Sequence, residues 1–432
     1  MERVKKYCFI FVLLLLFLPI AQRFWKLTNE GPLHGQTPFS NYPTFHLKDW
    51  NSGEYQKLVE LFLKGNFGFR NTLLRWNNSF DYLVFNKANA QKVIVGKDSH
   101  LFFDYNIERY LGIERQDPMV TDSLFVLTDS LRNCLKTRGI EFLYVIAPSN
   151  AYYYSDKFPS QYNRVEKKEN DYDYYLKKFD EYDIEYVDFN KWFLEIKDTV
   201  SIDLFPTHGT HYTYFSAVWV ADSLLKYMET LKDIDIPEVV MQDVYIDTME
   251  NYEHDLENLL NIGHSLENEN VYHYNLSFNQ EGKTKPKVLV VGDSFYWAII
   301  NQVIPRNCFS NVSYWFYNEK VYPESFTATK APNEVDLDSL FTDLDYIVVY
   351  SSATLLLAYD YKGFIGDMFN YLSGNYTKVV RDERLQYWIN AIKNNPDWLN
   401  SVKNKARDLN IPIEEQIQNE AEWMVKQENK NK

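Results

Sequence analysis

Three short apolar runs, far apart along the chain, most constrain the fold. Residues 142–147, 288–291 and 346–350 are each long enough for one strand and are apolar or aromatic throughout. Runs of this kind are typical of strands buried on both faces, as in parallel sheets covered by helices. Apolar residues at helical spacing lie between them, for example over 122–138 and 172–182. The alternation predicts an α/β fold with a mostly parallel sheet flanked by helices.

The N-terminus predicts a membrane anchor. Three basic residues precede an apolar run over 7–21, and Arg23 and Lys26 follow it. At 1.5 Å per residue this run spans roughly 23 Å, enough for a bilayer when interfacial residues flank it. Its end lacks the small residues of a signal-peptidase site, and no cysteine follows for lipid attachment. We expect a single-pass protein of the inner membrane, with residues 1–6 cytoplasmic, an uncleaved signal anchor over 7–22, and the rest in the periplasm.

The remaining chain divides by composition. Residues 23–45 are polar, contain Gly and Pro, and predict a linker. The main domain is expected over 46–375, and a charged helical C-terminal tail over 376–432. Within the main domain, residues 234–285 are polar and patternless, which predicts a long insertion or a β-rich excursion.

Charge and cysteine content exclude several classes of protein. The chain of 432 residues has 45 basic and 60 acidic side chains, a net charge of −15. Nucleic-acid binders need a basic stripe, so we expect no nucleic-acid partner. Three cysteines without a CxxC pair exclude a disulfide scaffold and a cysteine zinc site. Aromatic residues reach 17 %, which suits stacking on sugar rings, although most such residues serve packing.

A serine follows the strongest strand signal. The strand at 288–291 runs into Gly292-Asp293-Ser294-Phe295 and then into an apolar helix. A serine on such a turn exposes its hydroxyl beside the free amides of the next helix, which can bind an oxyanion. The segment differs from the GxSxG elbow of α/β-hydrolases. In the alternative interpretation, Asp293 or Ser294 is only a helix N-cap.

His211 is the candidate base for this serine. It lies in a Gly/Thr-rich turn that opens a helical stretch, where a side chain can point toward the ends of the strands. The alternative is an ordinary surface or core histidine. His208 and His211 have the spacing of metal ligands, but no third ligand is nearby and no HExxH occurs, so no metal is expected.

Three short blocks then occur in a recognisable order. They are 93–102 (VIVGKDSHLF), 207–212 (THGTHY) and 290–295 (VVGDSF). In this order they resemble the SGNH-hydrolase-like bacterial polysaccharide O-acetyltransferases of the alginate AlgX/AlgJ type. The first block resembles the family's "vivGkdgWLF", with His100 in place of Trp. The second resembles its D-x-H-W block, with Tyr212 in place of the last Trp, and the third its G-D-S-F block.

The resemblance implies roles for individual residues. Ser294 is the expected acyl-accepting nucleophile and His211 its base. The family's orienting carboxylate stands two residues before the histidine, where this chain has Gly209. Either another acid serves, with Asp203 as the candidate, or a Ser–His dyad suffices, or the site is degenerate. Further residues are assigned to the oxyanion or the substrate: Gly292, Asp293, Phe295 and Asn150, the last also interpretable as a turn-stabilising residue.

The implied fold is an SGNH-like domain, and the implied reaction is acetyl transfer to hydroxyls of an exported cell-envelope polysaccharide. No cofactor is expected, because a partner or an acetylated carrier supplies the acetyl group. In such systems the partner is a multispanning membrane-bound O-acyltransferase (MBOAT). Two alternatives stay open: a carbohydrate acetyl esterase using the same residues, and a non-catalytic saccharide-binding or assembly subunit.

Overall fold

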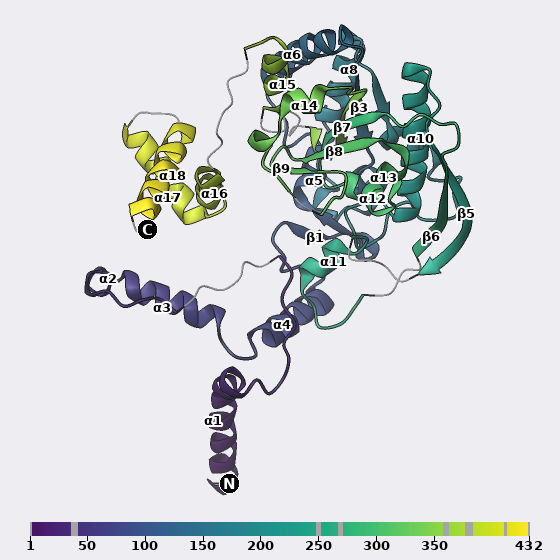
Figure 1. Ribbon diagram of the computed structural model, residues 1–432. Coiled ribbons are helices and arrows are strands. Elements are labelled where there is room, and N and C mark those ends of the chain that lie inside the picture. Colours follow the sequence, from purple (N-terminus) through teal and green to yellow (C-terminus); the bar gives the residue numbers. More distant parts are fainter. Residues whose placement is uncertain are drawn as a thin grey trace.

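The computed structural model describes residues 2–35, 42–247, 252–266, 271–327, 329–356, 363–375, 383–409 and 413–430. Its centre is a six-stranded sheet with the order β4-β3-β10-β7-β8-β9 (Figure 1). These strands are β3 (Glu141–Ala147), β4 (Tyr186–Asp188), β7 (Lys287–Gly292), β8 (Asn311–Phe316), β9 (Lys320–Tyr322) and β10 (Tyr346–Ser352). Every neighbouring pair is parallel except β8 and β9. The predicted α/β fold with a mostly parallel sheet is confirmed.

Helices cover both faces of the sheet, because alternate strand residues point to opposite sides. Leu143 and Val290 belong to one hydrophobic core and Phe142 and Leu289 to the other. The first face is covered by α9 (Phe189–Ile196), α10 (Tyr214–Lys232), α12 (Tyr296–Asn301) and α13 (Ile304–Cys308). The second is covered by α6 (Pro118–Lys136), α8 (Asp171–Tyr182), α14 (Leu337–Phe341) and α15 (Phe364–Leu372).

Two hairpins lie outside the main sheet. The first pairs β1 (Val93–Val95) with β2 (Leu101–Phe103) and leads into α5 (Asp104–Tyr110). The second pairs β5 (Glu238–Asp247) with β6 (Val271–Asn279), and α11 (Asp255–Leu260) lies between its strands in the sequence. The region predicted as an insertion or a β-rich excursion is therefore a long hairpin with a short helix.

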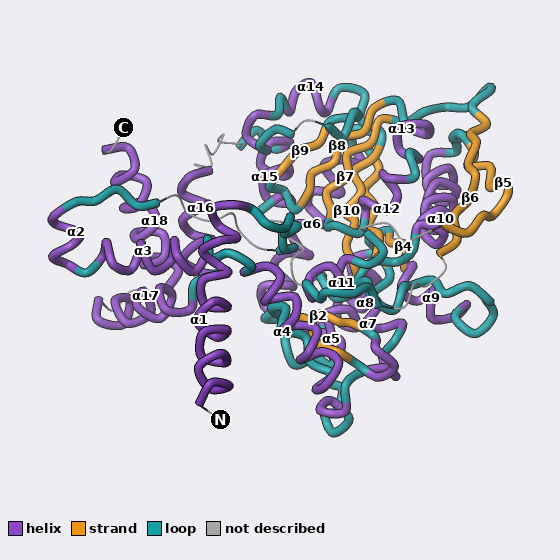
Figure 2. Tube along the Cα trace, turned by 90° about the horizontal axis from the view of Figure 1, so that it is seen from below, coloured by secondary structure: helices purple, strands orange, loops and turns teal. Residues whose placement is uncertain are grey.

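Helices at both ends of the chain project from the sheet domain (Figures 1 and 2). The N-terminal ones are α1 (Glu2–Trp25), α2 (Leu47–Ser52), α3 (Glu54–Gly65) and α4 (Arg70–Phe85). Helix α1 is long and apolar enough to cross a membrane. The tail forms α16 (Glu383–Lys393), α17 (Pro396–Leu409) and α18 (Ile413–Lys430), which share a small core. The predicted start of the tail at residue 376 lies outside the described residues.

Candidate active site

Ser294 occupies the turn between β7 and α12, at the carboxyl end of the sheet. The turn begins at Gly292, where a Cβ atom would lie 2.7 Å from the carbonyl oxygen of Tyr350 on the neighbouring strand. Only glycine lets β7 approach β10 this closely. Ser294 is half-buried, so its hydroxyl remains reachable. Gly292 thus shapes the backbone that presents the serine.

Asp293 and Phe295 have structural positions beside the serine. The buried carboxylate of Asp293 accepts hydrogen bonds from the backbone N–H of Ser352 (2.7 Å) and of Phe295 (3.0 Å). It therefore joins the ends of β7 and β10 and fixes the turn. The N–H of Phe295 is used in this bond, while its ring packs 4.6 Å from the imidazole of His211. Asp293 and Phe295 thus support the serine turn, and their expected contact with the oxyanion or the substrate stays a prediction.

The buried carboxylate predicts a pH dependence of stability. Burial raises the pKa of Asp293 to about 6, although its two backbone hydrogen bonds oppose the rise; in the unfolded chain the pKa is about 3.9. Between these values the folded protein binds the proton more tightly, so the free energy of unfolding falls as the pH rises through this window. In urea titrations, wild type should gain about 2 kcal/mol relative to Asp293→Asn as the pH falls from about 7 to about 4. A difference that stays constant with pH would contradict this role of Asp293.

His211 lies against the serine. Its Nε2 is 2.8 Å from the Ser294 hydroxyl oxygen. The imidazole is nearly fully buried and stacks on the ring of Tyr252, with 4.2 Å between the ring centroids. The Tyr252 hydroxyl donates to the carbonyl oxygens of Ser294 and Phe295, at 3.2 and 3.3 Å. Tyr252 therefore contacts both the imidazole and the serine turn, and it fixes their relative position.

A carboxylate also faces His211, but it comes from an unexpected segment. Asp255, the first residue of α11, places Oδ2 3.1 Å from His211 Nδ1 and accepts the backbone N–H of Thr210 on Oδ1 (2.8 Å). The Nδ1 contact is at ion-pair distance but off the line of a hydrogen bond, as is common in catalytic sites without substrate. Asp203, the sequence candidate, has an exposed side chain near Tyr153 and does not contact His211.

Gly209 explains why the acid is not at its expected position. A Cβ atom at residue 209 would lie 2.3 Å from the carbonyl oxygen of Glu253 and 2.8 Å from the Pro206 ring. The segment that delivers Asp255 therefore fills the space beside residue 209. The same segment holds the histidine loop, since the N–H of Glu257 donates to the His208 carbonyl (3.1 Å). The site has a carboxylate, supplied by the insertion.

Asn150 supports the histidine loop from the other side. Its side-chain amide donates to the carbonyl oxygens of Gly209 (3.2 Å) and Leu101 (3.4 Å), and the residue is buried. The bonds join the start of α7 (Asn150–Tyr153) and β2 to the loop. Asn150 therefore bridges two segments, and its expected contact with an oxyanion or the substrate stays a prediction.

Tyr317 was not predicted from the sequence, yet it contacts the serine. It follows β8 in the left-handed region, with φ of 50°, and its N–H donates to the carbonyl of Gly292 (2.9 Å). Its phenol lies close enough to Ser294 for the side chain and backbone of the serine to oppose the rise of its pKa. Burial raises the pKa of Tyr317 to about 12, so the phenol is protonated at neutral pH. No motif precedes Tyr317, and only the pairing of β8 beside β7 could have revealed it.

Comparisons with known proteins agree with the fold. Residues 93–298 match the family model described as "SGNH hydrolase-like domain, acetyltransferase AlgX". No curated protein sequence matches the chain.

Several solved structures are similar at low identity. The O-acetyltransferase domain of Pseudomonas putida AlgJ has a TM-score of 0.39 and 15% identity, over 65% of this chain and 99% of that one. Pseudomonas aeruginosa AlgX has 0.44 and 13%, over 70% of each chain. Bacillus cereus PatB1, solved with a sulfonyl adduct, has 0.41 and 14%, over 65% and 98%. The family match covers just under half of the chain and includes both Ser294 and His211, and this region therefore has an SGNH hydrolase-like fold and is similar to acetyltransferase AlgX.

Proposed function

We propose that this protein is an O-acetyltransferase that modifies hydroxyls of an exported cell-envelope polysaccharide through an acetyl-Ser294 intermediate. The observation that carries the proposal is the continuous chain from Ser294 Oγ through His211 to Asp255. A serine needs a base that accepts its proton, and the base needs a carboxylate that selects its tautomer. The contacts of His211 meet both requirements.

The reaction has two halves. Ser294 Oγ attacks the acetyl carbonyl of the donor while His211 Nε2 takes the hydroxyl proton. When the tetrahedral intermediate collapses, the donor's leaving group departs with that proton and acetyl-Ser294 remains. A sugar hydroxyl then attacks the acetyl-enzyme, His211 accepts its proton, and collapse returns the proton to Ser294 Oγ. Asp255 stabilises the imidazolium formed in each half.

The oxyanion formed in each half requires a hydrogen-bond donor. The Tyr317 phenol lies beside Ser294 and can turn its hydroxyl toward an oxyanion formed there, whereas the next amide, of Phe295, already donates to Asp293. We expect Tyr317→Phe to lower kcat for acetyl transfer by roughly 10- to 1000-fold, with KM changing little. The reason is that a hydrogen-bond donor to the oxyanion stabilises the transition state and not the bound substrate. Steady-state kinetics with an activated acetyl ester measures both constants. A rise in KM at constant kcat would assign Tyr317 to ground-state binding instead.

The acetyl donor comes from the membrane side. The proposal places α1 in the inner membrane and the catalytic domain in the periplasm, where cytoplasmic acetyl-CoA is not available. A multispanning membrane-bound O-acyltransferase, or an acetylated carrier, would deliver the group, and the chain itself needs no cofactor. The single apolar helix long enough to span a bilayer, among the described residues, supports this arrangement.

Product analysis separates transferase from esterase. The purified chain is given an activated acetyl ester with and without an oligosaccharide acceptor, and acetylated sugar and free acetate are quantified, with Ser294→Ala as background. We expect the acceptor to divert acetyl groups from water to sugar. Release of acetate alone, together with deacetylation of an acetylated glycan, would identify an esterase. Tight glycan binding without turnover of any donor would identify a binding or assembly subunit.

A further inference from the structure

Helix α3 has an apolar side that is covered only in part, by rings such as Tyr42 on Phe62 and Phe45 on Tyr55. With 3.6 residues per turn, this side carries Tyr55, Leu58, Val59 and Phe62, Leu61 and Leu63 lie at its borders, and the opposite side carries Gln56, Lys57, Glu60 and Lys64. Within α3, Gly65 alone is buried. Leu61 and Leu63 each remain 60% exposed. An amphipathic helix normally buries its apolar side against a core, and α3 does not.

Helix α4 packs on the domain with its polar side, whereas a surface helix normally buries its apolar side. Its polar side packs on the domain: Asn78 donates to the carbonyl of Leu260 (2.8 Å), and Ser79 accepts the N–H of Gly263 (2.8 Å). Its apolar residues form a stripe on the outward side and are 44 to 68% exposed: Leu73, Trp76, Phe80, Leu83 and Val84. A stripe this large is unusual on a protein surrounded by water.

Both apolar sides adjoin the outer end of α1. Helix α1 has 24 residues and is about 36 Å long, slightly more than the roughly 30 Å of bilayer hydrocarbon, so its last turns reach the membrane–water interface. The turn between α3 and α4 packs against α1 near its outer end. A Cβ atom on Gly68, in this turn, would lie 2.0 Å from the carbonyl oxygen of Pro19 in α1. The Arg23 guanidinium lies 6.0 Å from the centre of the Phe62 ring. In Figures 1 and 2, α3 runs across the direction of α1.

We propose that α3 and α4 lie in the lipid interface, with their apolar sides inserted at the boundary of headgroups and acyl chains. Leu, Phe and Trp on one side with Lys and Glu on the other are typical of interfacial helices. Lipid is favoured as the occupant because the exposed sides continue directly from the exit point of α1. The inference rests on α1 being a retained membrane anchor, as in the proposed function.

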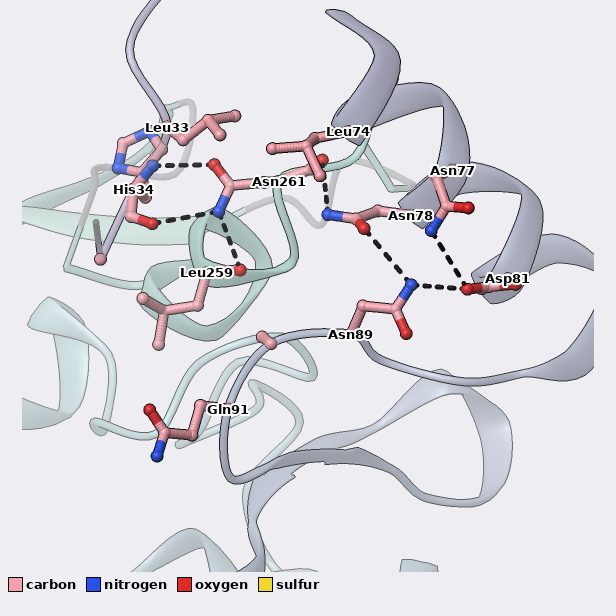
Figure 3. Close-up of a pocket in the computed structure, with 12 residues that line it drawn as sticks. Leu33, His34, Leu74, Asn77, Asn78, Asp81, Asn89, Gln91, Leu259 and Asn261 are labelled. Atoms are coloured by element: carbon pink, nitrogen blue, oxygen red, sulfur yellow. Dashed lines mark hydrogen bonds between the residues drawn. The ribbon is translucent and has the colours of Figure 1, made fainter. Parts of the chain in front are cut away.

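This arrangement sets the position of the active site relative to the membrane. Figure 3 shows the joint between α4 and the segment after α11, which encloses a hollow of about 720 Å³ lined mainly by amide and leucine side chains. Asn78 bonds the end of α11, and Asn261 bonds both the N–H and the carbonyl of His34 in the linker (2.8 and 3.0 Å). Helix α11 begins with Asp255. The interfacial helices are therefore joined through one short helix to the catalytic acid.

Nitroxide labels on the full chain in phosphatidylcholine/phosphatidylglycerol vesicles test the proposal. Cys8 and Cys134 are replaced by serine, the buried Cys308 is kept, and single cysteines are introduced as Leu58→Cys, Phe80→Cys and, as a matched control on the opposite side of α3, Glu60→Cys. Collision with oxygen reports lipid, and collision with a water-soluble nickel chelate reports solvent. We expect labels at 58 and 80 to favour oxygen at least several-fold more than the label at 60. Circular dichroism checks that each variant is folded.

Three results would overturn the proposal. Labels at 58 and 80 that are as accessible to nickel as the label at 60 would place the helices in water. Labels shielded from both reagents would indicate a protein partner. A Leu13→Cys label in α1 marks the bilayer: if it favours oxygen while 58 and 80 do not, the interfacial inference alone fails. If Leu13→Cys itself is accessible to nickel, the anchor fails, and with it the localisation in the proposed function.

Discussion

Ser294→Ala is expected to abolish formation of a covalent acetyl adduct when the protein is treated with an activated acetyl ester. The hydroxyl is the only group of residue 294 that can carry the acetyl, and the 2.8 Å contact with His211 supplies its base. His211→Ala should keep the nucleophile but lower the rate of adduct formation by at least 1000-fold, because the serine hydroxyl must then attack the ester without a proton acceptor. Intact-protein mass spectrometry over a time course measures both effects.

One outcome would contradict the assignment of Ser294 as the nucleophile. An adduct that persists in Ser294→Ala, and that maps to another residue after digestion, would remove Ser294 from the mechanism. Ser294→Ala should unfold at a temperature close to that of wild type, since it removes one atom, whereas His211→Ala removes a buried, stacked ring and should unfold at a somewhat lower temperature. A large loss of stability would mean that absence of the adduct reports unfolding.

Asp255→Asn is expected to lower kcat/KM for acetyl transfer by roughly 100- to 10,000-fold. The carboxylate faces Nδ1 of His211 and stabilises the imidazolium, whereas an amide can present its N–H to the ring and favour the wrong tautomer. Asp203→Asn is the matched control and should retain nearly full activity, because its side chain is exposed and does not contact His211. Equal losses in the two variants would contradict the assignment.

Restoring the family's acid at residue 209 should not rescue Asp255→Asn. The double variant Gly209→Asp/Asp255→Asn must place a Cβ 2.3 Å from the backbone oxygen of Glu253, a contact that forces the segment to move. We expect lower thermal stability than in Asp255→Asn and no recovery of rate. Recovery of activity would show that the insertion yields easily and that the position of the acid is interchangeable.

The parts of the fold that were predictable are those that repeat a local pattern. Strands β3, β7 and β10 are continuous apolar runs because both faces are buried, and that pattern is visible without a structure. Strand β8, with the sequence NVSYWF, mixes polar and aromatic residues and precedes an antiparallel edge strand, so it lacked this signal. With β8 unassigned, Tyr317 at its end could not be connected to Ser294.

The base and nucleophile were predictable, and the acid was not, for a related reason. Ser294 and His211 each lie beside a strong local signal, a strand end or the start of a helix. Asp255 lies in a polar stretch without periodicity, and its role depends on a tertiary contact with Thr210 and His211. The one clue was Gly209, whose missing side chain marks the space that the other segment fills.

The carboxylate that faces His211 comes from residue 255 and not from residue 209, and this placement restricts which sequences can form the site. Two acids cannot coexist in this packing, because any side chain at 209 collides with the backbone that delivers Asp255. A chain carrying acids at both positions would therefore be destabilised. Searches for relatives that require an acid two residues before the histidine would miss chains that place the acid as this one does. A search that pairs glycine at that position with an acid opening a later short helix would find them.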